Sequence, residues 1–158
     1  QLVNIAQSDN PGKPVFVLGH SMGSFITRTY LNDHSDEVTG ALLSGTAGSA
    51  GFLAISGNIL TSIIMLFKRK DAPTPLMNFL TFGAYNKQFK PARTDFDWLC
   101  SDEKVVDEYV ADPFCGTIFS VGFFKNLING LEFVNSKKHA ESIDKDLQCF
   151  SSRGIKIL

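Results

Sequence analysis

The sequence predicts an α/β fold in which parallel strands are flanked by helices and a helical insertion follows the second strand. Residues 14–18 form a short, continuous apolar run, which is typical of a parallel strand covered on both faces. Apolar residues then recur at helical spacing over 22–32, and a second apolar segment follows at 38–44. Strand, helix and strand in this order predict a βαβ unit with a right-handed crossover.

The composition narrows the class of protein. The chain has 158 residues, 44% of them hydrophobic, which is enough for one core. A net charge of −1 argues against a nucleic-acid partner. The three cysteines, Cys100, Cys115 and Cys149, fit neither a metal pattern nor a disulfide framework, which favours a reducing, cytoplasmic compartment. We expect no metal and no organic cofactor.

The junction between the first strand and the next helix carries the most specific motif. Residues 19–23 are Gly-His-Ser-Met-Gly, a G-x-S-x-G pattern that predicts a nucleophile elbow. In such a turn, Gly19 and Gly23 remove Cβ atoms that would clash. Ser21 is then the expected nucleophile, and the backbone amide of Met22 is an expected oxyanion donor. The alternative is a tight turn that holds an ordinary serine.

Outside the βαβ unit, the sequence shows no alternating strand pattern and predicts mainly helices and loops. A helix is expected over 1–7, before the first strand. The apolar run at 59–67 is too short to span a bilayer and predicts a lid helix, with contact at a membrane surface as the alternative. Further helices are expected at 102–111, where Ser101 can act as N-cap, and at 117–133 and 136–142. The expected organisation is a core over 1–46, a helical cap over 47–143 and a return to the core over 144–158.

Three stretches resemble the monoacylglycerol lipase and lysophospholipase-like α/β-hydrolases, which are also grouped with serine aminopeptidase-like hydrolases. These stretches are residues 14–24, 43–47 and 93–113, and the cap stretch is most similar to bacterial members. The resemblance implies a partial α/β-hydrolase fold, a parallel sheet with flanking helices plus a helical cap. It also implies that Ser21 is the nucleophile, that the Met22 amide is one oxyanion donor, and that the second donor lies upstream of Gln1. The triad order in this fold is serine, acid, histidine.

No residue of the chain suits the two other triad positions. His20 occupies the variable slot of the elbow, His34 ends the following helix, and His139 lies in a lysine-rich helix of the cap. Among the acids, some lie in the cap and the others precede the last strand instead of ending it: Asp95, Asp97, Asp112, Asp144 and Asp146. We therefore expect that the triad Asp and His are absent from this chain.

The last residues suggest a reason for this absence. The resemblance implies an apolar strand after Leu147 that ends in a Gly-Asp-x-Asp-Pro turn, but residues 148–158 are polar instead. Back-translation in a neighbouring frame permits the expected strand and turn. We expect that the chain is a fragment with a frameshift near Leu147; the alternative is a true, divergent end.

We expect that the intact protein, of which this chain is a fragment, hydrolyses a lipid-like carboxylic ester such as a monoacylglycerol or a lysophospholipid through an acyl-enzyme. An apolar cap fits a small substrate that carries an acyl chain. The chain itself is expected to be poorly active. A non-catalytic lipid-binding remnant is the alternative, and peptidase, thioesterase or haloperoxidase activity is compatible with the same elbow.

Overall fold

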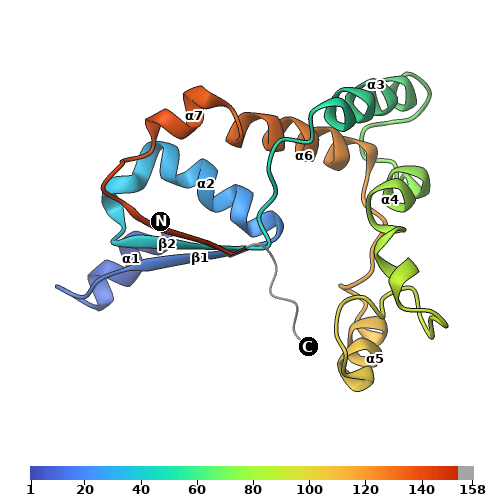
Figure 1. The fold of residues 1–158 in the computed structure, drawn as a ribbon, viewed down its shortest axis with the longest axis horizontal. Helices are drawn as coiled ribbons and strands as arrows, with labels where there is room; N and C mark the ends of the chain where they lie inside the picture. Colours follow the sequence, from blue (N-terminus) through green and yellow to red (C-terminus); the bar gives the residue numbers. More distant parts are fainter. Residues whose placement is uncertain (153–158) are drawn as a thin grey trace. The chain divides into compact units, whose positions relative to one another are not determined.

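The structure, a computed structural model, describes residues 1–152, and its contacts divide them into two units (Figure 1). The first unit comprises residues 1–55 and the described residues from 128 onward, and the second comprises residues 56–127. The part of the frameshift hypothesis that concerns residues 153–158 lies outside the described residues. The helices and strands are α1 (Leu2–Asp9), β1 (Phe16–His20), α2 (Met22–His34), β2 (Gly40–Ser44), α3 (Phe52–Phe67), α4 (Pro75–Phe82), α5 (Glu103–Ala111), α6 (Val121–Val134), α7 (Lys137–Ser142) and β3 (Gln148–Ser152).

The three strands of the first unit form one parallel sheet in the order β1-β2-β3. In this register Leu18 pairs with Leu42, and Leu42 pairs with Phe150. Helix α2 lies along one face of the sheet (Figure 1), where Leu31 and Ala41 belong to the buried core. The predicted βαβ unit and the parallel sheet with flanking helices are therefore confirmed.

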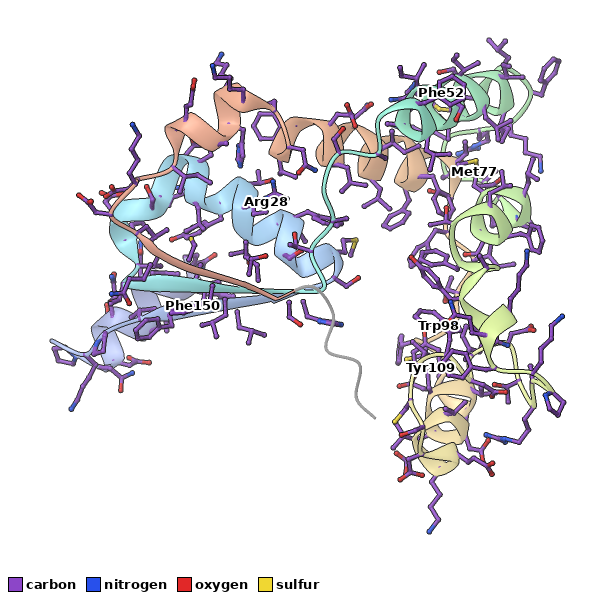
Figure 2. All side chains as sticks on the ribbon, in the orientation of Figure 1. Arg28, Phe52, Met77, Trp98, Tyr109 and Phe150 are labelled. Atoms are coloured by element: carbon purple, nitrogen blue, oxygen red, sulfur yellow. The ribbon has the colours of Figure 1, made fainter. Side chains whose placement is uncertain are left out.

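The opposite face of the sheet is apolar and open within the described part of the chain. Side chains alternate between the faces of a strand, so Leu18, Leu42 and Phe150 share one face. Their exposed fractions are 67%, 41% and 70%, and Figure 2 labels Phe150 on its strand. The expectation that the apolar run at 14–18 is covered on both faces is thus met on one face only.

The helices differ from the expectation in four respects, one of which is that α6 begins at Val121, four residues after its expected start at 117. Helix α3 begins at Phe52, seven residues before the apolar run that predicted it. Helix α4 was not predicted, although Pro75 lies at its first turn, a position that proline favours. The N-cap of α5 is Asp102 rather than Ser101, and its carboxylate accepts a hydrogen bond from the Lys104 amide at 2.9 Å.

The second unit has its own small core and a polar network. Val106, Val121 and Phe124 are buried in it, and an isolated antiparallel bridge joins Pro73 to Ser120. None of the helices that the structure describes is both long enough and apolar enough to cross a bilayer.

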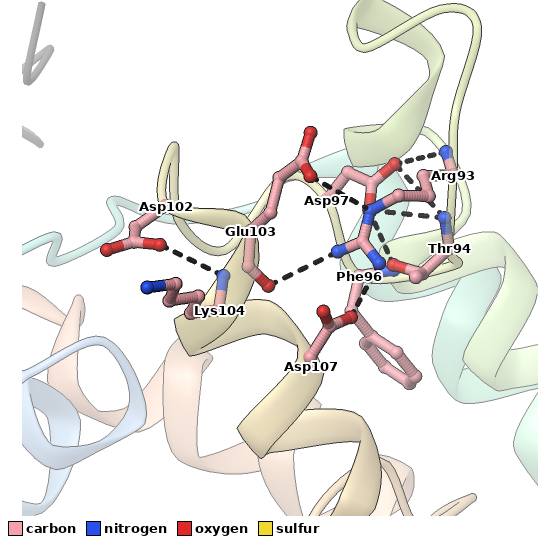
Figure 3. Close-up of polar contacts among 8 residues, drawn as sticks. All are labelled: Arg93, Thr94, Phe96, Asp97, Asp102, Glu103, Lys104 and Asp107. Atoms are coloured by element: carbon pink, nitrogen blue, oxygen red, sulfur yellow. Dashed lines mark hydrogen bonds and ion pairs between the residues drawn. The ribbon is translucent and has the colours of Figure 1, made fainter.

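The polar network of the second unit is centred on Arg93 (Figure 3). The Arg93 guanidinium donates to the Asp107 carboxylate on α5, and the Arg93 amide donates to the Asp97 carboxylate. The hydroxyl and amide of Thr94 also donate to Asp97, and these hydrogen bonds hold the pKa of Asp97 below its usual value. This network fixes the loop that precedes α5.

Candidate functional site: the turn at Ser21

Ser21 is the single residue between the end of β1 and the start of α2. Its backbone has φ 51° and ψ −120°, and it is the one non-glycine residue with positive φ in the described range. L-residues rarely adopt this conformation, which costs about 1–3 kcal/mol and persists only where the surroundings impose it. The Ser21 amide donates to the Ser44 carbonyl at 2.9 Å, so the turn is fastened to the carboxyl end of β2. The Ser21 side chain is exposed at this edge of the sheet.

Gly19 permits the close approach of strand and helix. A Cβ atom at this position would lie 2.5 Å from the Gly23 carbonyl oxygen and 2.5 Å from Thr27 Oγ1. At Gly23, in contrast, an added Cβ would meet nothing within 4 Å among the described residues. An added Cβ atom would therefore clash at Gly19 but not at Gly23, whose carbonyl oxygen lies against Gly19.

The Met22 amide lies at the start of α2. Met22 is the first residue of α2, and the first four amides of a helix have no partner within it. The helix dipole also favours negative charge at this end. An amide donor next to the Ser21 hydroxyl is the arrangement that an oxyanion needs.

Two histidines of the first unit lie on the surface. Nδ1 of His20 lies 3.1 Å from Ser44 Oγ, so its ring reaches across the carboxyl ends of β1 and β2. Sequence reasoning missed this contact, although the parallel register predicts that these two residues are neighbours. Nδ1 of His34 contacts Glu37 at 2.8 Å. His34 ends the 13-residue helix α2, about 20 Å from Ser21 at the rise of an α-helix.

His139 is only 2% exposed and lies with its ring centroid 4.8 Å from that of Phe133. Neither ring nitrogen meets hydrogen-bond geometry with a described group. Burial lowers the pKa of His139; the Arg28 carbonyl opposes this and the Arg28 charge adds to it. The ring lines a cavity of about 310 Å³ whose lining includes Leu43 but not Ser21.

Three of the five aspartates considered as triad acids accept hydrogen bonds within turns or in the Arg93 network. Asp112 accepts from the Phe114 amide at 2.8 Å, Asp144 accepts from the Asp146 amide at 2.9 Å, and Asp97 belongs to the Arg93 network. No hydrogen bond joins a histidine to any of the five aspartates considered, within the residues that the structure describes. The described range also holds no group of three or more residues that could bind a metal ion.

The strain at Ser21 predicts a stability gain for Ser21→Gly. Glycine adopts positive φ without the Cβ penalty, so the free energy of unfolding should rise by about 1 kcal/mol. Ser21→Ala is the matched control, because it removes the hydroxyl and keeps the Cβ atom. Urea unfolding followed by circular dichroism measures both. Equal stability of the two variants would show that the Ser21 backbone is not strained.

A parallel sheet in which a strand passes through one strained serine into a helix defines the α/β-hydrolase class. The family model described as serine aminopeptidase, S33, matches residues 1–147, and the chain belongs to this family of hydrolases. The comparison with curated proteins gave no significant match.

Solved structures bear out the fold. A thermostable carboxyl esterase from Bacillus coagulans, in complex with glycerol, has 23% sequence identity to this chain and a TM-score of 0.76. The match covers 92% of this chain and 47% of the esterase. A lipase in its open form has 20% sequence identity and a TM-score of 0.73, and the match covers 94% of this chain and 50% of the lipase. The chain therefore spans about half the length of these two proteins, and the predicted partial α/β-hydrolase fold is confirmed.

Proposed function

We propose that the protein is a serine ester hydrolase by family in which Ser21 is the nucleophile, and that the described chain on its own is poorly active. The observation that carries the proposal is the strained backbone of an exposed serine between β1 and α2. Ser21 Oγ attacks the acyl carbonyl and its proton passes to a base, while the Met22 amide donates to the developing oxyanion. The alcohol leaves, and water then releases the acid from the acyl-enzyme.

A lipid-type substrate is supported by the surface of α3. A stripe of apolar side chains follows this helix at spacings of three and four residues and is at least 49% exposed: Phe52, Ile55, Ile59, Ile63 and Leu66. Such a stripe matches the acyl chain of a monoacylglycerol or a lysophospholipid. Lys68, Arg69 and Lys70 follow the helix, which also favours transient contact with a lipid surface.

The described chain supplies little of the base catalysis that this mechanism needs. His20 contacts Ser44, His34 contacts Glu37, and the nitrogens of His139 make no hydrogen bond with a described group. A serine without an adjacent imidazole stays a weak nucleophile, and only binding and oxyanion stabilisation then contribute. The alternative, a lipid-binding module without catalysis, shares the α3 surface and differs in the reactivity of Ser21.

A fluorophosphonate probe and a p-nitrophenyl ester test the proposal together. We expect slow covalent labelling that mass spectrometry maps to Ser21, with ester turnover close to that of Ser21→Ala. Ser101→Ala, which removes a hydroxyl from an exposed serine elsewhere, should label as the wild type does. Lipid binding without any labelling of folded wild-type protein would support the non-catalytic alternative. Rapid, Ser21-dependent turnover would contradict the expected low activity.

A further inference from the structure

The second unit contains a small cavity with an aromatic lining. Its volume is about 230 Å³, which is below the roughly 300–1,000 Å³ of pockets for drug-sized ligands. Six aromatic side chains from α4, α5 and the loops beside them line it: Phe82, Phe96, Trp98, Tyr109, Phe114 and Phe119. Figure 2 labels Trp98 and Tyr109 in this part of the chain. The size restricts a ligand to a small group.

The rings are closely packed around the cavity. The ring centroids of Phe96 and Tyr109 lie 5.1 Å apart, and the Tyr109 hydroxyl accepts a hydrogen bond from the Gly116 amide at 3.2 Å. Gly116 has φ +67°, and a Cβ atom there would lie 3.0 Å from the Phe96 ring. Asn78 and Thr117 add neutral polar groups, and no charged side chain lines the cavity. The lining can therefore accept a cation without repulsion from a lysine or arginine.

The segment that supplies most of this lining is acidic. Within residues 91–120 the basic residues are Arg93 and Lys104, and the guanidinium of Arg93 is already paired with Asp107. The acidic residues of the same segment are Asp95, Asp97, Asp102, Glu103, Asp107, Glu108 and Asp112. The whole chain carries a net charge of only −1, so this segment, which supplies most of the lining, is more acidic than the rest of the chain. Such a local field raises the concentration of cations near it.

From these observations we infer that the cavity binds a small organic cation that carries a quaternary ammonium group. The faces of aromatic rings bear negative partial charge and attract such cations, which are too large and too weakly hydrated to need hydrogen-bond acceptors. The acidic surroundings add attraction at longer range. The ligand group is the same whether it belongs to a free amine such as choline or to a choline headgroup. The inference concerns the second unit alone and does not depend on the reactivity of Ser21.

The fluorescence of Trp98 reports on the cavity directly, because Trp98 is the one tryptophan of the chain. Choline and tetramethylammonium should change its emission saturably, and increasing salt should weaken their binding through screening. The neutral isostere 3,3-dimethylbutan-1-ol has the same shape without the charge, and we expect it to bind about tenfold more weakly. Glycerophosphocholine shows whether the quaternary ammonium group that binds belongs to a headgroup or to a free amine. Tighter binding than choline indicates a headgroup, and weaker binding indicates a free amine.

Variants connect the signal to the lining. Tyr109→Leu should weaken choline binding about tenfold through loss of a cation–π contact. Phe114→Leu should weaken it as well without disturbing the fold, because Phe114 is 91% exposed. Tyr85→Leu is the matched control: Tyr85 contacts Trp98 at 4.9 Å between ring centroids but does not line the cavity. Equal affinity for choline and its neutral isostere, or equal affinity of all three variants, would overturn the inference.

Discussion

Gly19→Ala is expected to destabilise the first unit by about 2–3 kcal/mol, in the range of overpacked cores. The new Cβ atom would lie 2.5 Å from the Gly23 carbonyl and from Thr27 Oγ1, and Gly19 is buried. The backbone carbonyl belongs to α2, so relief requires that the helix move away from β1. Urea unfolding gives the loss of stability. Labelling at Ser21 should fall as well, because the same movement disturbs the turn.

Gly23→Ala is the matched control for this prediction. An added Cβ atom at Gly23 meets nothing within 4 Å among the described residues. Alanine is also favoured over glycine in a helix by up to about 1 kcal/mol, so this variant should be as stable as the wild type or more so. Equal destabilisation by the two substitutions would show that flexibility, and not close approach, determines the need for glycine at position 19.

Arg28→Met is expected to destabilise the first unit by about 1–2 kcal/mol, because it leaves partly buried acceptors without their donor. The Arg28 guanidinium donates to the Val134 carbonyl, to Asn135 Oδ1 at 3.0 Å and to the Ala47 carbonyl at 3.3 Å. It therefore joins α2 to the end of α6 and to the segment after β2. Burial lowers the pKa of Arg28, in keeping with a partly desolvated guanidinium. Methionine keeps much of the side-chain volume and removes every donor.

Arg69→Met provides the comparison for Arg28→Met. The Arg69 side chain is 87% exposed and pairs with the exposed Asp71, two residues away. An exposed ion pair of this kind contributes little to stability. Thermal unfolding should therefore separate the two variants clearly. If they unfold at the same temperature, the contacts of Arg28 do not stabilise the unit.

The elements that could be predicted from the sequence are those with a strong local signal. The apolar run before Gly19 and the helical spacing after Ser21 are sufficient to predict β1, α2 and the turn between them. Helix α4 was missed because its apolar residues lie within a segment rich in proline and aromatic residues. Asp102 and Ser101 are both favourable N-cap residues. The sequence alone does not show which of the two side chains accepts a hydrogen bond from a free amide at the start of α5.

The surroundings of Ser21 were harder to predict because they depend on contacts between distant segments. The Ser21 amide donates a hydrogen bond to the Ser44 carbonyl. A side chain at position 19 would clash with Thr27 on the next helix, so this position requires glycine. The role of Arg28 left no signal in the sequence, since its three acceptors lie 19 to 107 positions away. The assignments of Ser21 and of the Met22 amide to catalysis stay predictions until labelling tests them.

The open face of the sheet has a consequence for the physical state of the protein. Leu18, Leu42 and Phe150 form an apolar surface, and β1 and β3 each leave one edge without a neighbour among the described residues. Free strand edges beside an apolar face are templates for pairing between molecules. Self-association should therefore grow with concentration, so measurements on the isolated chain belong at low micromolar concentration.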